Sequence, residues 1–180
     1  MKKLISKVYE GYPEQPFISE DRDLADWEQF PEKYPYAKVE IKQMKRLEED
    51  LLPGDIIMLW RIGFDNFTNE SVIPAYFEYR YGINHLESQQ RLKDLGYMYE
   101  GSVLQTLPLI STPVLKRLLK ENGLSQAGKK AEILQRVIDN IELKQLEAAI
   151  SLRRFVITES GRALLEKYHD IIKRHGPKQM

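Results

Sequence analysis

Apolar residues recur at helical spacing along much of the chain, which predicts a mainly α fold of the α+β class. Residues 39–51 combine apolar and charged side chains at this spacing, and we expect one helix there that ends at Pro53-Gly54. Residues 56–62 are a continuous apolar run, whose pattern fits either a buried helix or a buried strand. Asp55 is a suitable N-cap directly before this run and favours the helix.

Glycine and proline divide the middle of the chain into two further helices. The first is expected to begin at Pro74 and to stop at Gly82, and the second to run from the N-cap Asn84 through Leu95. Residues 63–71, which precede both helices, have the composition of a polar loop.

The sequence also predicts a small β-hairpin or a three-stranded sheet. Residues 97–104 have the pattern of a hairpin, and residues 154–157 have the pattern of a further strand. Thr158 would cap a closing helix that reaches about Arg174. The order helix, helix, hairpin, strand and helix is similar to that of a winged helix.

Residues 112–141 predict two short amphipathic helices joined by a tight turn. Thr112-Pro113 is a strong helix start, and Gly123 can take the left-handed conformation that ends the first helix. The second helix is expected at about residues 129–141. Because two helices of this length bury little apolar surface, we expect the C-terminal strand and helix to support them.

The net charge of zero hides a division of the chain. Residues 1–110 hold 13 Lys and Arg against 19 Asp and Glu, a net charge of −6. Residues 111–180 hold 14 Lys and Arg against 8 Asp and Glu, a net charge of +6. The basic half is suited to a polyanion, and the alternative is that the two halves attract each other.

Composition divides the chain into four expected segments. Residues 1–37 are irregular and rich in proline and aromatic residues, with one helical turn expected at residues 24–30. Residues 38–110 form an acidic, mainly helical domain that ends in the hairpin. Residues 111–145 are the helix-turn-helix module, and residues 146–180 are a strand followed by a basic helix.

The turn inside the module ends in Gly128-Lys129-Lys130, which places two ammonium groups beside the free N–H groups of a helix start. A phosphate would be well bound there. The order Leu-Lys-x-Leu-Leu-Lys, Gly-Leu-Ser-x-x-Gly-Lys-Lys-Ala-Glu, an apolar pair and an arginine closely resembles the SAP family. The resemblance covers about 30 of the 180 residues, and Ser125 stands where many members of the family have proline.

The resemblance implies a module that binds DNA, often AT-rich, through the turn and the start of the second helix, with RNA as the alternative partner. The implied contact residues lie in this turn and beside it, and they are Gln126, Gly128, Lys129 and Lys130, flanked by Lys120 and Arg136. The implied core of the module consists of Leu115, Leu119, Leu124, Ile133, Leu134 and Val137.

A second resemblance is limited to residues 73–83, which are similar to small uncharacterised proteins of Gram-positive bacteria and their phages. This similarity implies no activity. The same residues hold an aromatic cluster beside Arg80, for which core packing is favoured over stacking on exposed bases. The cluster consists of Tyr76, Phe77, Tyr79 and Tyr81.

The basic side chains near the C-terminus have two interpretations. They either extend a phosphate-binding track from the turn, or they pair with the acidic half of the chain. These side chains are Arg153, Arg154, Arg162, Lys167, Lys173 and Arg174.

Other kinds of site find no support in the sequence. The chain has no cysteine, its three histidines are scattered, and residues 21–26 lack the central glycine and terminal glutamate of a calcium loop. No phosphate-binding Gly-rich loop and no nucleophile elbow occurs. We therefore expect a non-enzymatic protein without metal or cofactor. The lack of cysteine and of a membrane-length apolar stretch makes a cytoplasmic location the expectation.

Two function classes follow from these patterns. The first is a non-enzymatic nucleic-acid-binding protein that contacts mainly the phosphate backbone of DNA. The second is a protein–protein interaction adaptor, in which the acidic half docks a protein partner and the basic module only supports the fold.

Overall fold

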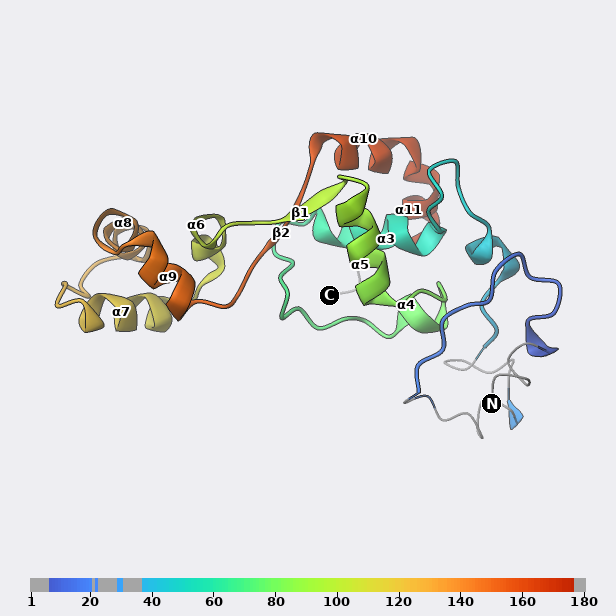
Figure 1. The fold of residues 1–180 in the computed structure, drawn as a ribbon, viewed down its shortest axis with the longest axis horizontal. Coiled ribbons are helices and arrows are strands. Elements are labelled where there is room, and N and C mark those ends of the chain that lie inside the picture. The colour runs from blue at the N-terminus through green and yellow to red at the C-terminus, as the bar shows by residue number, and fades with distance from the viewer. Residues whose placement is uncertain (1–6, 21, 23–28, 31–36, 177–180) are drawn as a thin grey trace. The chain divides into compact units, whose positions relative to one another are not determined.

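The computed structural model describes residues 7–20, 22, 29–30 and 37–176. Nine α-helices, α3 to α11, lie wholly within these residues, together with two short 3₁₀ helices and a two-stranded antiparallel sheet (Figure 1). The mainly α prediction is confirmed. The helical turn expected at residues 24–30 lies largely outside the described residues, as does much of the segment 1–37.

The chain folds into two compact units, each assembled from separated segments of the sequence. Unit 1 consists of Met1–Gly63, Val72–Met98 and Ile157–Met180, and unit 2 consists of Phe64–Ser71 and Tyr99–Val156. Because these segments alternate along the chain, the units differ from the four consecutive segments expected from composition. That four-part division stays a prediction.

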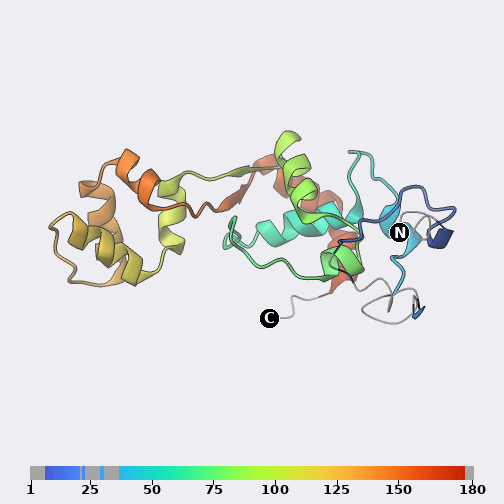
Figure 2. The ribbon, with the colours of Figure 1, turned by 60° about the horizontal axis from the view of Figure 1, so that its bottom comes forward.

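Unit 1 is built around α3 (Pro53–Ile62), a helix that is buried on almost every side. The helices α5 (His85–Asp94) and α10 (Glu159–Lys167) pack against it (Figures 1 and 2). A helix that is apolar all round needs such cover. The run at residues 56–62 is therefore a buried helix, as expected. Asp55, however, is the third residue of this helix and not its N-cap, and Pro53 begins α3 instead of ending an earlier helix.

The helix expected at residues 39–51 is wrong. Only η1 (Ile41–Met44) is helical there, and the chain then turns, with the N–H of Leu47 donating to the carbonyl of Leu51 at 2.8 Å. Asp50 has a φ of 60°, which lies outside the α-helical region. Three apolar residues of this segment, among them Leu51, are nevertheless fully buried. The spacing of apolar residues in this segment thus follows from which side chains are buried, and it does not indicate a helix.

The two helices expected in the middle of the chain are confirmed. The first, α4 (Tyr76–Tyr79), is one turn long and ends before Gly82, whose φ is 63°. Asn84 caps α5, because its side-chain oxygen accepts hydrogen bonds from the N–H groups of Leu86 and Glu87.

The aromatic cluster of residues 76–81 packs inside unit 1, which confirms the favoured interpretation. Phe77 and Tyr81 are 1% and 2% exposed and therefore present no face to a base. The ring of Tyr79 is half-buried, and the guanidinium carbon of Arg22 lies 4.4 Å from its centre.

The hairpin expected at residues 97–104 is wrong, because its second half is helical. Strand β1 (Met98–Glu100) pairs instead with β2 (Phe155–Ile157), which is the strand expected near the C-terminus, and among the described residues the sheet has two strands. The predictions of a three-stranded sheet and of a winged-helix order are wrong as well, because α6 (Val103–Thr106) takes the place of the second hairpin strand.

A capping box starts the helix that replaces the hairpin. The hydroxyl of Ser102 accepts a hydrogen bond from the N–H of Gln105, and the side chain of Gln105 accepts one from the N–H of Ser102. These bonds begin α6 (Val103–Thr106). A Ser-x-x-Gln spacing is itself a sequence signal for a helix start.

The closing helix of the chain is interrupted once. Thr158 caps α10 as expected, and its hydroxyl accepts a hydrogen bond from the N–H of Gly161 at 3.1 Å. The backbone leaves helical geometry at Tyr168, after which α11 (His169–His175) follows and packs against α3. The single helix expected to about Arg174 is therefore two helices.

Unit 2 contains the two-helix module, which consists of α7 (Thr112–Glu121) and α8 (Lys130–Asn140). Both helices match the sequence expectation. They share one apolar core with α6, η2 (Leu107–Leu109) and α9 (Leu143–Ala149) (Figures 1 and 2). All six core residues implied by the family resemblance belong to this cluster, with Leu124 and Leu134 partly buried at its edge.

Support for the module comes from α6, η2 and α9, and not from the C-terminal helix. Val103 of α6 and Leu107 of η2 are almost completely buried, as is Leu146 of α9. The described residues of this core include none from α10 or α11, which belong to unit 1. The expectation that the C-terminal helix supports the module is therefore wrong, and the hydrophobic partners lie on either side of the module in sequence.

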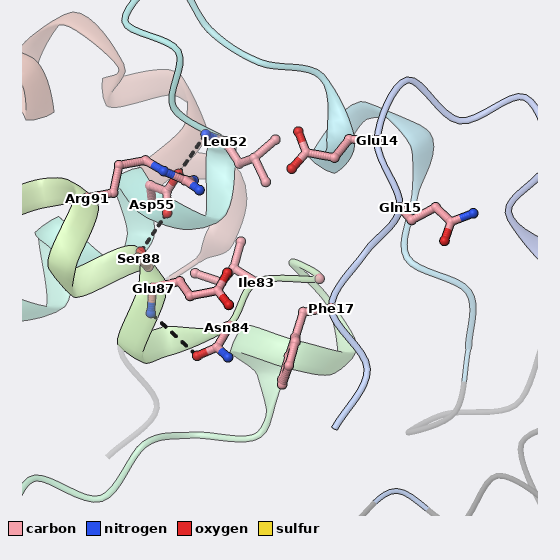
Figure 3. Close-up of a pocket in the computed structure, with 11 residues that line it drawn as sticks. Glu14, Gln15, Phe17, Leu52, Asp55, Ile83, Asn84, Glu87, Ser88 and Arg91 are labelled. Atoms are coloured by element: carbon pink, nitrogen blue, oxygen red, sulfur yellow. Dashed lines mark hydrogen bonds and ion pairs between the residues drawn. The ribbon is translucent and has the colours of Figure 1, made fainter. Parts of the chain in front are cut away.

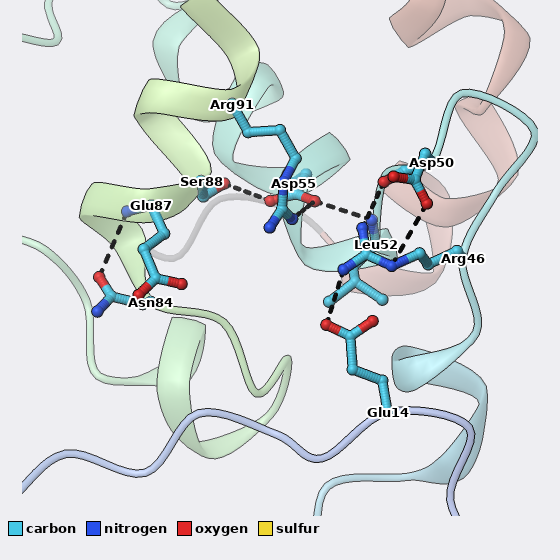
Figure 4. A network of polar contacts seen from close by, with 9 residues as sticks. All are labelled: Glu14, Arg46, Asp50, Leu52, Asp55, Asn84, Glu87, Ser88 and Arg91. Atoms are coloured by element: carbon cyan, nitrogen blue, oxygen red, sulfur yellow. Dashed lines mark hydrogen bonds and ion pairs between the residues drawn. The ribbon is translucent and has the colours of Figure 1, made fainter. Parts of the chain in front are cut away.

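A buried carboxylate links α3 to α5 inside unit 1 (Figures 3 and 4). Asp55 is completely buried, and it accepts hydrogen bonds from the N–H of Leu52 at 2.8 Å and from the hydroxyl of Ser88 at 2.6 Å. The guanidinium of Arg91 lies 3.2 Å from the same carboxylate. Because both carboxylate oxygens have donors, the cost of burying this charge is offset.

An aromatic cluster around His175 holds α11 in unit 1. Nδ1 of His175 is hydrogen-bonded to the hydroxyl of Tyr81 at 2.6 Å, and the imidazole centre lies 4.9 Å from that of Tyr76 and 5.4 Å from that of Trp60. Arg80 donates to the last carbonyls of α11. Burial lowers the pKa of His175, and the positive charge of Arg80 lowers it further. Burial also raises the pKa of Tyr81 to about 12, so its hydroxyl stays protonated.

Replacing Asp55 by alanine should destabilise unit 1 by about 3 kcal/mol, because a buried hydroxyl and a buried N–H lose their acceptor. Urea denaturation followed by circular dichroism measures this change. The matched control is Asp94→Ala, which removes an exposed carboxylate from α5 and should change stability by less than about 0.5 kcal/mol. Equal stabilities of the two variants would show that the Asp55 contacts contribute nothing.

His175 should make the protein less stable as the pH falls below the ordinary histidine pKa of about 6.5. Its pKa is lowered in the folded state, so the unfolded chain takes up the proton first and stability is lost on acidification. We expect the melting-temperature advantage of wild type over His175→Gln to be larger at pH 7.5 than at pH 5.5. An advantage that grows at the lower pH would contradict a half-buried imidazole that is neutral at pH 7.5.

Candidate nucleic-acid interface

The turn between α7 and α8 is exposed and begins at a glycine. Gly123 ends α7 with a φ of 67°, and the N–H of Leu124 then donates to the carbonyl of Leu119 at 2.8 Å, which places the Leu124 side chain at the edge of the core. Residues 125–130 follow and are all exposed. The apolar core thus fixes both ends of a turn whose middle faces solvent.

The first turn of α8 carries its own anion. The carboxylate of Glu132 accepts a hydrogen bond from the N–H of Lys129 at 3.0 Å, where Lys129 is the N-cap residue. The position predicted for a phosphate therefore already has a negative group beside it. Sequence reasoning missed Glu132, although a glutamate three residues after an N-cap is the signal of a capping box.

Gly128 is required by the geometry of this cap. Its φ is 114°, a conformation that side chains rarely adopt. A Cβ at this position would collide with the carboxylate of Glu132. Glycine thus allows the Glu132 side chain to fold back over the start of α8.

Arg136 holds the turn from inside α8. Its guanidinium donates to the carbonyls of Ser125 at 2.8 Å and of Ala127 at 2.9 Å. Arg136 lies four residues after Glu132 and so on the same helix face. Two side chains of one helix face therefore form hydrogen bonds with the backbone of the turn.

The structure brings together three of the residues implied by the family resemblance, which are Gln126, Gly128 and Lys129 on the exposed turn. The ammonium group of Lys130 donates to the carbonyl of Pro108 at 2.8 Å and so ties α8 to the middle residue of η2. Lys120 is exposed in the last turn of α7. Contact of these residues and of Arg136 with nucleic acid stays a prediction.

Several basic side chains near the C-terminus pair with acidic groups. Lys167 lies 2.7 Å from Glu48 and 2.5 Å from Glu49. Although burial acts to raise the pKa of Glu49, hydrogen bonds from Lys167 and Tyr168 lower it overall. The guanidinium of Arg154 lies 2.9 Å from the carboxylate of Asp65. Pairing with acidic residues thus accounts for part of the basic charge that a phosphate track would need.

Unit 1 contains a pocket of about 190 Å³ that sequence reasoning did not predict (Figure 3). Leu52 and Ile83 line it, and Glu87 and Arg91 project from α5 beside it. Sites for small molecules usually have at least about 300 Å³. Asp55, which also lines the pocket, already has three donors. Among the described residues no group of three or more His, Cys, Asp or Glu side chains can hold a metal ion.

One segment of unit 2 is similar to a known protein family. Residues 107–142 match the family model of the SAP domain, which is in general a nucleic-acid-binding module. No curated protein and no solved structure matches the chain significantly. In the part of the chain that the structure describes, no helix has the length and apolar character needed to cross a membrane.

Replacing Gly128 by alanine should cost about 2 kcal/mol, because the backbone conformation is strained for alanine and the Glu132 cap is displaced. The control is Gly123→Ala, where φ is also positive but the new methyl group meets no atom. That variant should cost about 1 kcal/mol. Urea denaturation of both variants measures the difference, and a larger cost at Gly123 would contradict the described cap.

Proposed function

We propose that the protein binds duplex DNA through its SAP domain and acts by binding alone, without catalysis. The observation that supports this proposal most is the exposed turn at the N-terminus of α8, which lies within the matched segment 107–142. Gln126 and Lys129 project from this turn next to a glycine that lets the backbone come close to a ligand.

Phosphate is the chemical group that this arrangement fits best. The first N–H groups of α8 have no partner within the helix, and the positive end of the helix dipole lies at the same place. Lys129 adds an ammonium group, and the segment 107–142 as a whole holds 6 Lys and Arg against 4 Asp and Glu. Binding of this kind is modest in affinity, strongly salt-dependent and weakly selective for sequence.

Lys120 extends the proposed contact beyond the turn. It lies in the last turn of α7 and is exposed. Lys130 and Arg136 act in this proposal mainly by holding the backbone around the turn, because each side chain already donates to protein carbonyls. The same proposal includes a cytoplasmic location, because nucleic acid is accessible there. The chain has no cysteine and therefore no disulfide bond that would need an oxidising compartment.

The test replaces Lys129 by glutamine and titrates the full chain with duplex DNA between 50 and 200 mM salt. Loss of one phosphate contact should weaken binding about fivefold and reduce the slope of log affinity against log salt by about 0.9. The matched control is Lys45→Gln, which removes an exposed lysine of unit 1 and should leave both quantities unchanged.

The outcome decides between three cases. Equal binding by the Lys129→Gln and Lys45→Gln variants would contradict the proposed interface. No binding by wild type at 50 mM salt would contradict the function itself. A parallel titration with duplex RNA of the same sequence tests the choice of DNA, since tighter binding to RNA would overturn it.

A further inference from the structure

We propose that Glu132 is a resident competitor of phosphate, and that its carboxylate limits the affinity of the SAP domain for nucleic acid. This inference rests on the proposed function, because it concerns the same turn. It assigns to Glu132 a role opposite to that of the neighbouring lysines: the side chain is part of the interface and opposes binding.

The contact geometry puts the two anions in competition for one place. The Glu132 carboxylate lies 3.0 Å from the N–H of Lys129, at the start of α8. A phosphate that approaches the first N–H groups of the helix must come close to this carboxylate. Either it displaces the carboxylate, or it binds beside it against like-charge repulsion. Both routes make binding weaker than it would be without the charge.

The exposure of the site makes such an exchange feasible. Glu132 and Lys129 are both exposed, and the only hydrogen bond described for the Glu132 side chain is the one to Lys129. The solvated carboxylate can therefore swing away from the helix start at the cost of this one exposed capping hydrogen bond. In the free protein it neutralises part of the positive helix end, which stabilises α8 by the usual amount of an acidic residue in a first turn.

The turn does not depend on the Glu132 charge for its shape. Arg136 holds the carbonyls of Ser125 and Ala127 through two separate hydrogen bonds. Lys130 is tied to Pro108 independently of both. Loss of the charge at position 132 should therefore leave Gln126 and Lys129 in place and remove only the competition.

The test is the variant Glu132→Gln in the full chain, titrated with the same duplex DNA at 100 mM salt. Glutamine keeps a side-chain oxygen that can accept from the N–H of Lys129, so the cap is retained without its charge. A charge at a helix N-terminus has an effect that corresponds to roughly threefold to fivefold in affinity. We expect the variant to bind tighter by this factor.

The matched control is Asp139→Asn, which removes the same charge from the same helix. Asp139 lies seven residues further along α8, about 10 Å along the helix axis and thus about one Debye length away. It accepts a hydrogen bond from Gln135, which asparagine can also do. We expect less than about a 1.5-fold change in affinity for this variant. Circular dichroism checks that both variants keep their helix content.

Each result has one meaning. A gain for Glu132→Gln well above that for Asp139→Asn supports the inference. Equal changes in the two variants would overturn it, since only net charge would matter. Weaker binding by Glu132→Gln at unchanged helix content would also overturn it, because the carboxylate would then position the site. If the Lys129→Gln variant loses affinity in the same assay, the proposed function stands whichever result is found here.

Discussion

Every helix that lies wholly within the described residues has at most eleven residues, and helices of that length are marginal in water without partners. This constraint determines how both units are built. In unit 1 the apolar helix α3 is covered by neighbours, and Asp55 joins it to α5 through a buried carboxylate. In unit 2 the two helices of the segment that matches the SAP domain share their core with α6, η2 and α9. The matched segment and its flanking residues therefore share a single apolar core.

The parts of the fold that sequence predicts well are those with local signals. Asn84 and Thr158 cap their helices through bonds to residues two or three positions away, and Gly123 ends α7 by its own backbone conformation. The failures involve distant partners. Residues 39–51 are apolar at helical spacing because they face the core of unit 1, and β1 pairs with a strand more than 50 residues later. A single sequence holds no record of such pairings.

The candidate site shows the same limit. Its place, the turn before α8, follows from the order of glycine, lysine and apolar residues. The role of each basic side chain in the turn does not follow from the sequence. A lysine or arginine that donates to a backbone carbonyl cannot be told apart, in sequence, from one that is free to bind a phosphate. Lys130 and Arg136 are of the first kind in this structure. The same holds for Lys167, which pairs with Glu48 and Glu49, so the charge of +6 counted for residues 111–180 overstates what a polyanion would meet.

The alternation of the two units along the chain has a consequence for synthesis. The main segment of unit 2, Tyr99–Val156, is made after α3 but before α10 and α11, which pack on α3 about 100 residues later in sequence. The residues of the unit 2 core thus leave the ribosome before α10 and α11 do. Until α10 and α11 emerge, α3 lacks two of its covering helices and exposes apolar surface. It is the segment of this protein that we expect chaperones to bind on the nascent chain.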